Sequence, residues 1–440
     1  MMSAMTLGAG GFALLLALMG ARIPIGLAML VIGGLGTLLI TGPMSILNSL
    51  KTLPYEHFSS HTLSIIPLFL LMGQFAARAG LSSAMYQATN DWLGHRRGGL
   101  AMSTIGACGA FGAICGSSLA TAATMTQVAL PEMERQGYRG SLAAGALAAG
   151  GTLGILIPPS VVLVIYAILA EQNINDMFAA ALVPGLLAVG SYMLAISCYV
   201  RLFPASAPSK PKAALSDRWH SLIDVWPGAA IFIIVIGGIY TGVFTPTEAA
   251  AVGAVATGIL AATRGGLRWE GLRDCLLETA STTAMIFFIV LGASLFNSFL
   301  ALTQFPQTTA GWIVNLEISP WVVLAGILLC YLLLGCFMDS LSMILLTVPI
   351  FLPIMQGMDF GMSPGDIAIW FGILSLVVVE VGMITPPVGL NIFIIHSMAP
   401  RVGLSEIFTG IVPFLIADVV RIILLVAFPT ITLGLVYLLY

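Results

Sequence analysis

Charged residues are scarce in this chain, and their scarcity excludes a soluble fold. Of 440 residues only 8% are Asp, Glu, Lys or Arg, whereas 59% are hydrophobic and the mean hydropathy is +1.04. Soluble domains carry about 25% charged residues. A chain of this composition needs a lipid bilayer around it, and its length supplies roughly ten apolar spans of about 20 residues each. We therefore expect an all-α polytopic membrane protein.

Basic runs and cysteine or histidine motifs are also missing. No cluster of Lys and Arg indicates a nucleic-acid partner. The six cysteines show no C-x-x-C spacing, the five histidines are scattered, and neither an H-E-x-x-H motif nor a suggestive Ser–His pairing occurs. These absences argue against an intramembrane enzyme and favour a transporter. A channel or receptor is the remaining class, and a channel would show a current much larger than any carrier turnover.

One long polar insert divides the chain nearly in half. Residues 201–223 are rich in Pro, Ser and Ala and predict a cytoplasmic linker between a first repeat at 1–200 and a second at 224–440. Across it, Leu130-Pro131 matches Leu352-Pro353 at an offset of 222 residues. Each half holds five predicted spans and one hairpin, and an odd number of crossings would invert the second half relative to the first, as in many secondary transporters.

The basic residues provide an independent test of this topology. If the N-terminus lies outside, 14 of the 16 Lys and Arg residues fall on the cytoplasmic side, which leaves Lys51 outside and Arg421 within the last span. No basic residue precedes the apolar stretch at 12–19, so we expect a retained first span and not a signal peptide. Both termini then lie outside.

Two short polar stretches interrupt apolar arms that are too short to span. Gly116, Ser117 and Ser118 lie within residues 99–133, and Asp339 and Ser340 lie within residues 319–356. We interpret both as re-entrant hairpins with the polar residues at the tip, because non-helical backbone at membrane depth is tolerated only inside protein or beside a wet cavity. The two tips predict a binding site in mid-membrane. For any single Ser, close packing against a neighbouring helix is the alternative.

Consecutive prolines at 158–159 and 386–387 lie within two further spans. Proline lacks an amide hydrogen and clashes with the carbonyl one turn back, so a pair predicts a broken helix. The carbonyls freed near 154–157 and 382–385 could coordinate a cation with a neighbouring hydroxyl, and the helix N-termini near Ser160 and at 389–391 would face an anion. This arrangement indicates sodium-coupled uptake of a carboxylate. Merely kinked structural helices are the alternative.

Few charged residues fall inside the predicted spans, and such residues are functional candidates by default. Asp339 could bind a cation, cap the following helix or accept a proton, and we favour the first two roles together. Glu380 could equally face a cavity or bond to a neighbour. Asp418 and Arg421 are three residues apart and are expected to neutralise each other in a structural pair.

The same residues resemble the large membrane subunit of tripartite ATP-independent periplasmic (TRAP) transporters, the DctM-like proteins. The matching stretches cover nearly the whole chain in order, and the two double-proline motifs beside the tips make the resemblance specific. They are residues 109–123, 130–144 (LPEMERQGYRGSLAA), 150–166, 244–251 (FTPTEAAA), 338–355 and 380–393 (EVGMITPPVGLNIF).

The resemblance implies an elevator-type transporter in the bacterial inner membrane, with a scaffold and a moving transport domain. It implies coupling to Na+ at two or more sites, a small four-span membrane subunit as partner, and a periplasmic substrate-binding protein that delivers a small organic anion. The resemblance also implies which positions of this chain would bind sodium and substrate. The first sodium site falls on Ser117, Ser118, Gly154, Ile157 and Pro159, the second on Asp339, Ser340, Gly382, Thr385 and Pro387, and substrate on Ser118, Ser160, Thr385 and Asn391.

Two departures from the family pattern affect the expected site. Thr121 stands where an Asp is frequent, which removes a possible charge, and Ser340 stands where a Pro often follows the Asp, which adds a hydroxyl. The interpretation is a sodium-coupled importer of a carboxylate, such as a C4-dicarboxylate or a sugar acid, with no enzymatic activity. A self-sufficient sodium-coupled carrier of divalent anions, without a binding protein, is the alternative.

Overall fold

The computed structural model describes residues 4–264 and 266–439, and over these residues the chain is helical with no β-strand. The helices before the polar insert are α1 (Ala4–Gly20), α2 (Ile25–Thr41), α3 (Pro43–Phe58), α4 (Ile65–Arg78), α5 (Leu81–Leu93), α6 (Gly99–Cys115), α7 (Ser118–Arg135), α8 (Gly140–Leu156), α9 (Val161–Leu169) and α10 (Ile174–Leu202). Those after it are α11 (Leu215–Tyr240), α12 (Pro246–Thr263), α13 (Trp269–Thr303), α14 (Phe305–Asn315), α15 (Pro320–Gly335), α16 (Ser340–Gln356), α17 (Pro364–Gly382), α18 (Leu390–Met398), α19 (Leu404–Ala427) and α20 (Thr430–Leu439). Short 3₁₀ turns at Thr62–Ser64 and Pro204–Ser206 complete the list.

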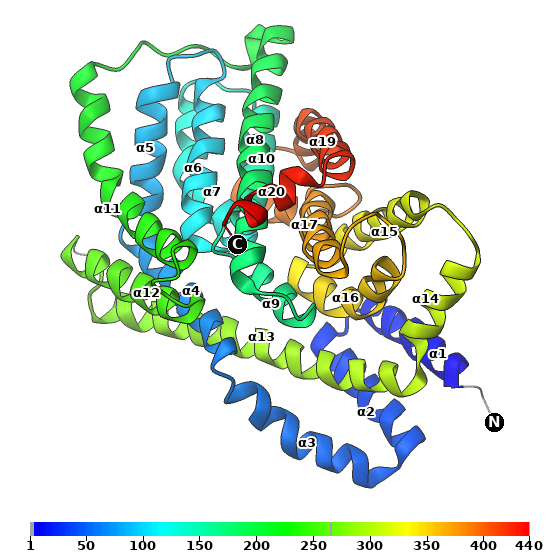
Figure 1. The fold of residues 1–440 in the computed structure, drawn as a ribbon. Helices are drawn as coiled ribbons and strands as arrows, with labels where there is room; N and C mark the ends of the chain where they lie inside the picture. The colour runs from blue at the N-terminus through cyan, green and yellow to red at the C-terminus, as the bar shows by residue number, and fades with distance from the viewer. Residues whose placement is uncertain (1–3, 265, 440) are drawn as a thin grey trace.

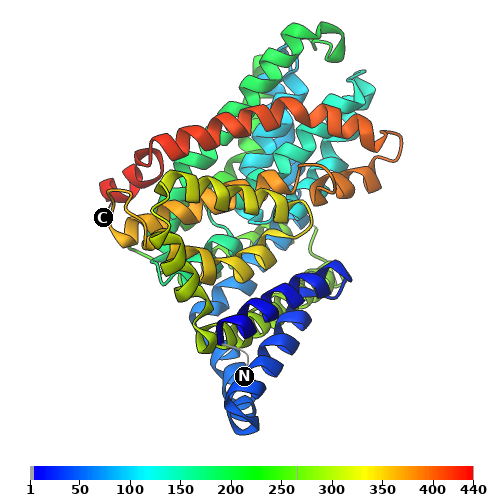
Figure 2. The same ribbon diagram turned by 90° about the vertical axis from the view of Figure 1, so that its right-hand side faces the viewer.

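The helices form two groups that differ in position (Figure 1). Helices α1–α4 and α12–α14 extend across the lower part of this view, where the long α13 packs along α2 and α4. Helices α6–α10 and α15–α20 form the upper and right part, where α5 packs against α6 and α11 packs against the outer side of α5. After a quarter turn, α1–α3 project below the rest and α19 runs across the upper part (Figure 2). Both hairpins and both broken helices belong to the upper group.

Small residues let helices of the lower group approach closely. A Cβ atom on Gly33 of α2 would lie 2.6 Å from the backbone carbonyl carbon of Leu295 in α13. Such close contacts through glycine are typical of helix pairs in membranes, where dispersion replaces the hydrophobic effect as the attraction between helices. Helix α12 begins with a complete capping box, in which Thr245 and Glu248 satisfy each other's backbone amides.

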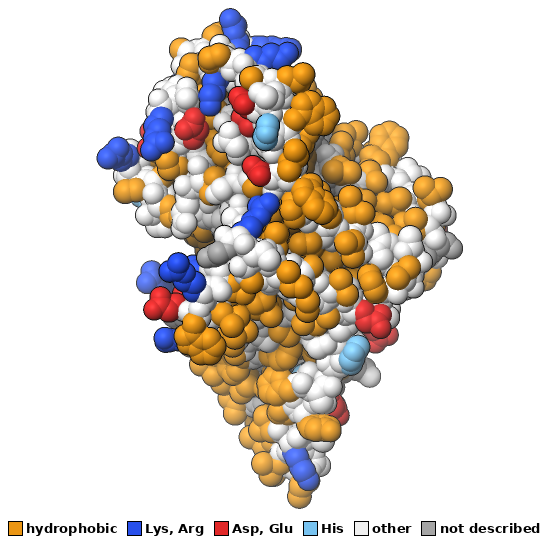
Figure 3. All heavy atoms as spheres, turned by 90° about the vertical axis from the view of Figure 1, so that its left-hand side faces the viewer, with side chains coloured by type: hydrophobic (Ala, Val, Ile, Leu, Met, Phe, Trp, Pro, Cys, Tyr) orange, Lys and Arg blue, Asp and Glu red, His pale blue; other side chains and the backbone are white. Residues whose placement is uncertain are grey.

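Five described helices are long and apolar enough to cross a membrane, or seven spans if each of two bent helix pairs counts as one. Helices α1 and α2, with 17 residues each, lie at the lower limit of spanning length. The predicted count of ten spans therefore stays a prediction. Hydrophobic side chains cover the lower and central part of one face, while Lys and Arg gather toward its upper end and one edge (Figure 3).

The helix boundaries differ from the sequence-based expectation in two places. The apolar stretch at 407–438 predicts a single last span, but it forms two helices, α19 and α20. The chain leaves α19 at Phe428, directly before Pro429, because proline disfavours helical backbone in the residue before it. The segment between α10 and α11, residues 203–214, is shorter than the linker expected at 201–223. Helix α11 begins at Leu215, and the prolines at 204, 208 and 211 oppose a regular α-helix between α10 and α11.

Candidate functional site

The first hairpin turns at the predicted tip and packs against the first helix break. Helix α6 ends at Cys115, Gly116 has a left-handed φ of +65°, and the Ser117 hydroxyl caps α7 by accepting a hydrogen bond from the Ala120 amide. A Cβ on Gly116 would lie 3.0 Å from the Pro159 carbonyl oxygen, and a Cβ on Gly154 would lie 2.6 Å from that of Ser117. The tip therefore contacts both sides of the break.

The first double proline breaks its helix as predicted. Helix α8 ends at Leu156 and α9 begins at Val161, with the Ser160 hydroxyl as its N-cap. In an uninterrupted helix the amides of residues 158 and 159 would donate to the carbonyls of Gly154 and Ile155. Prolines have no amide hydrogen to donate. Two buried carbonyls near the tip therefore lose their usual partners.

The second hairpin repeats this arrangement with a carboxylate at its tip. Asp339 caps α16, since its Oδ2 accepts a hydrogen bond of 3.1 Å from the Ser342 amide, which confirms the predicted capping role. The Cys336 carbonyl accepts a hydrogen bond from the Gly389 amide, and the Cys336 thiol donates to the Pro386 carbonyl. A Cβ on Gly382 would lie 2.7 Å from Gly335 Cα. This tip also packs against the helix break of its own half.

The second break is longer than the first. Helix α17 ends at Gly382 and α18 begins at Leu390, which confirms the predicted break at 386–387. The Thr385 hydroxyl donates to the Val381 carbonyl at 2.6 Å, and the Asn391 amide nitrogen of the backbone donates to the Met383 carbonyl. Thr385 is half-buried and Pro387 is exposed. Of the predicted ligands in this half, Ser340 and Gly382 are buried, Asp339 is partly buried like Thr385, and Pro387 is the most exposed.

The two tips meet at the end of α17. The Ser340 hydroxyl donates to Glu380 Oε1 at 2.7 Å and lies 3.0 Å from Met383 Sδ, while the Ser118 hydroxyl lies 4.0 Å from the same sulfur atom. Ser118, Ser340 and Glu380 are all buried. Glu380 thus bonds to a neighbour, one of the two roles left open above. Nothing in the sequence pattern singled out Met383, because a methionine inside an apolar span reads as a core residue.

Several buried polar groups near the tips have no hydrogen-bond partner among the residues described. They include the Thr121 hydroxyl, beside Gly154, and the amide oxygen and nitrogen of the Asn391 side chain. Both residues are completely buried. Unpartnered buried polar groups are rare in native proteins and call for an explanation such as a missing ion or ligand. Thr121 is a candidate ligand that the sequence identified only as a departure from the family pattern.

A cavity of about 250 Å³ adjoins the second tip. Its lining includes Asp339, Ser342 and Leu390, together with Arg22 from the loop between α1 and α2. It therefore connects the tip to the lower group of helices. No group of three or more His, Cys, Asp or Glu side chains lies together in the described part of the chain, so a cation here would need backbone and hydroxyl oxygens in addition to the Asp339 carboxylate.

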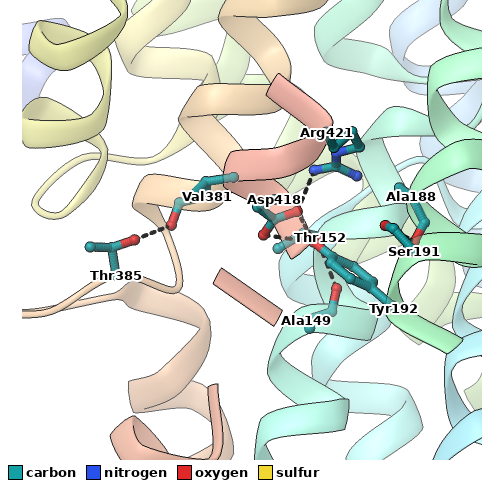
Figure 4. A network of polar contacts seen from close by, with 9 residues as sticks. All are labelled: Ala149, Thr152, Ala188, Ser191, Tyr192, Val381, Thr385, Asp418 and Arg421. Atoms are coloured by element: carbon teal, nitrogen blue, oxygen red, sulfur yellow. Dashed lines mark hydrogen bonds and ion pairs between the residues drawn. The ribbon is translucent and has the colours of Figure 1, made fainter. Parts of the chain in front are cut away.

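Asp418 and Arg421 form the predicted pair, within a larger polar network (Figure 4). Arg421 Nη2 lies 2.7 Å from Asp418 Oδ1. The Tyr192 hydroxyl donates to the Asp418 carboxylate and lies 3.3 Å from the Thr152 hydroxyl, which donates in turn to the Ala149 carbonyl. The network joins α8, α10 and α19 behind the first break, and it explains how two charges are buried inside this helix group.

Comparisons with known proteins agree with this architecture. The family model described as "Tripartite ATP-independent periplasmic transporter, DctM component" matches residues 12–431. The C4-dicarboxylate TRAP transporter large permease protein DctM of Pseudomonas aeruginosa is 37% identical, with 92% of each chain covered. The sialic acid TRAP transporter large permease protein SiaM of Vibrio cholerae is 30% identical, covering 95% of this chain and 96% of that protein.

A solved structure shares the fold at low identity. The YdaH transporter of Alcanivorax borkumensis superposes with a TM-score of 0.59 and 14% identity, covering 88% of this chain and 90% of that chain. The family match extends over nearly the whole chain, and both relatives are transport proteins. This chain belongs to the DctM family of TRAP transporters, and it is a multi-pass subunit of a bacterial inner-membrane transporter and not an enzyme.

Proposed function

We propose that this chain imports a small organic anion, coupled to sodium, as the large subunit of a three-part transporter. The observation that carries the proposal is the convergence of the two hairpin tips on Met383, each tip packed against its own helix break. The transported molecules named for relatives include C4-dicarboxylates and sialic acid. A carboxylate of this size is the substrate class we propose here.

Sodium fits the groups that the first tip presents. The ion prefers several oxygen ligands, and proline has removed the donors that would otherwise occupy the Gly154 and Ile155 carbonyls. The Ser117 carbonyl and the unpartnered Thr121 hydroxyl lie beside Gly154. These oxygens, with the predicted Ser118, Ile157 and Pro159 positions, would hold the first ion. Its bound charge would face the substrate between the tips.

The second ion would use Asp339, Ser340 and the backbone from Gly382 to Pro387. Asp339 uses Oδ2 to cap α16, and its carboxylate also lines the adjoining cavity. The Asn391 side chain and the N-terminus of α9, capped by Ser160, would hold the substrate anion, because helix N-termini carry partial positive charge. Sodium ions at the carbonyl ends of the broken helices would attract the substrate anion between them, so that the sodium gradient would drive uptake of the substrate.

The order of elements supports an inverted repeat with elevator movement. Helices α6 to α10 follow the sequence hairpin, broken helix and long helix, and α15 to α19 follow it again. The close contacts Gly112–Gly154 and Gly335–Gly382 occur at matching places in the two halves. In this proposal the helices that carry tips and breaks move as a unit against α1–α5 and α11–α14. Both termini are periplasmic.

Reconstitution tests the proposal and its alternative together. Proteoliposomes would hold this chain with and without a small four-span membrane subunit, and uptake of labelled carboxylates would be measured with and without an inward sodium gradient and the periplasmic binding protein. We expect accumulation only when all components and sodium are present. Uptake by this chain alone would support the self-sufficient carrier, and accumulation that is indifferent to sodium would overturn the assignment of cation sites.

A further inference from the structure

A large apolar groove lies on the upper helix group, away from both tips. It runs between α10 and α19, has a volume of about 760 Å³, and is lined from Ser191 to Leu202 on one side and from Thr409 to Val420 on the other. Its rims are large side chains that are more than half exposed, among them Leu194 and Ile416. Its floor contains smaller ones such as Ala195 and Cys198.

The length of the groove matches one leaflet of a bilayer. The stretch of α10 from Ser191 to Leu202 rises about 1.5 Å per residue, so the groove is about 17 Å long. Half of the hydrocarbon core of a bilayer is about 15 Å. In the predicted topology Leu202 lies at the cytoplasmic end of α10, next to Arg201. The groove therefore lies at the depth of the acyl chains of the cytoplasmic leaflet.

Among the described residues that line this groove, one side chain, that of Arg139, is cationic, and it lies at the predicted cytoplasmic end. Arg139 is exposed, lines the groove, and has no ion-pair partner within the described residues. The nearby Glu406 carboxylate accepts a hydrogen bond from the Ser141 amide, and no Asp or Glu side chain lines the groove. The Arg139 backbone is fixed by its amide, which donates to the Ser206 carbonyl. The guanidinium is free to bind an anion at headgroup level.

The side chains at the rims of the groove favour a lipid over a helix of a partner protein. Helix pairs in membranes meet through small residues that let the two backbones approach closely. The rims here are Leu, Ile, Val and Phe, which suit flexible acyl chains better.

We propose that this groove binds an anionic phospholipid of the cytoplasmic leaflet, with its acyl chains between α10 and α19 and its phosphate on Arg139. Basic pockets between transmembrane helices on the cytoplasmic side are suited to such headgroups. The site is separate from the tips and does not depend on sodium coupling. A lipid held there would fill the gap between two helices of the group that carries the transport site.

Native mass spectrometry tests the proposal on the full chain, purified in detergent with any membrane partner that stays bound. Phosphatidylglycerol and phosphatidylcholine would be titrated in parallel. The variants are Arg139→Ala, Ala195→Trp to fill the floor, and Arg97→Ala as the control. Arg97 is an exposed arginine outside the groove, also on the predicted cytoplasmic side. Cys198→Trp replaces Ala195→Trp if the latter does not fold.

We expect the wild-type chain to prefer phosphatidylglycerol. Arg139→Ala should weaken phosphatidylglycerol binding about fivefold, Arg97→Ala should leave it unchanged, and the filled groove should lose both lipids. Equal losses in the two arginine variants, equal affinity for the two lipids, or binding that survives the filled groove would each overturn the proposal. Lipid binding that appears only after a membrane partner is removed would assign the groove to that partner instead.

Discussion

Removing either member of the Asp418–Arg421 pair is expected to destabilise the protein severely. Both side chains are buried, at 0% and 1% exposure, and Nε and Nη1 of Arg421 have no hydrogen-bond partner among the described residues. Deleting one charge therefore leaves the other buried and uncompensated, which costs about 3–5 kcal/mol in proteins. The change to make is Asp418→Leu or Arg421→Met. Thermal unfolding of the purified protein in detergent measures the effect.

The double variant separates charge balance from other effects. When both charges are replaced by apolar side chains, no buried charge remains, and such replacements are often neutral in stability. We expect Asp418→Leu/Arg421→Met to recover most of the stability that either single variant loses, and to retain transport. A double variant as unstable as the worse single variant would show that Tyr192 and Thr152 need the carboxylate itself.

Adding a methyl group at Gly154 is expected to slow transport strongly. The new Cβ would lie 2.6 Å from both the Ser117 carbonyl oxygen and Thr121 Oγ1, and neither the backbone nor a buried β-branched side chain can move away cheaply. Overpacking of this kind costs about 1–3 kcal/mol. The first tip would have to separate from the helix break. We expect the rate of sodium-driven uptake to fall at least tenfold for Gly154→Ala.

A glycine in the second hairpin provides the matched control. Gly326 lies in α15, where an added Cβ would meet no atom within 4 Å, so Gly326→Ala should transport at close to the wild-type rate. Gly382→Ala should behave like Gly154→Ala, since its Cβ would meet Gly335 at 2.7 Å. Normal uptake by Gly154→Ala, at normal amounts of folded protein, would show that tip and break need not touch.

Local features of the site were predictable from the sequence, because each has a cause within a few residues. The double prolines end α8 and α17 for want of amide donors, Asp339 caps the helix that follows it, and Asp418 and Arg421 are one helical turn apart. The sequence analysis did not give enough weight to Pro429. The apolar sequence continues past this proline, but helix α19 ends just before it.

The meeting of the two tips could not be read from the sequence. Ser118 and Met383 are 265 residues apart, and a contact across that distance leaves no periodicity in the residues between. That Glu380 accepts a hydrogen bond from Ser340, and does not face a cavity, likewise depends on how α16 packs against α17. The groove between α10 and α19 was equally invisible, because apolar positions facing a groove and facing lipid look alike in sequence.

The most direct test of the cation sites is the sodium dependence of uptake after Asp339→Asn, measured in proteoliposomes over a range of sodium concentrations. Asparagine can still cap α16, so the folded complex should persist. Loss of a charge-assisted contact costs about 1.5–3 kcal/mol, which predicts a rise of at least tenfold in the sodium concentration for half-maximal uptake. Asp359→Asn, in an exposed turn, should match the wild-type protein. An unchanged sodium dependence in Asp339→Asn would contradict the account.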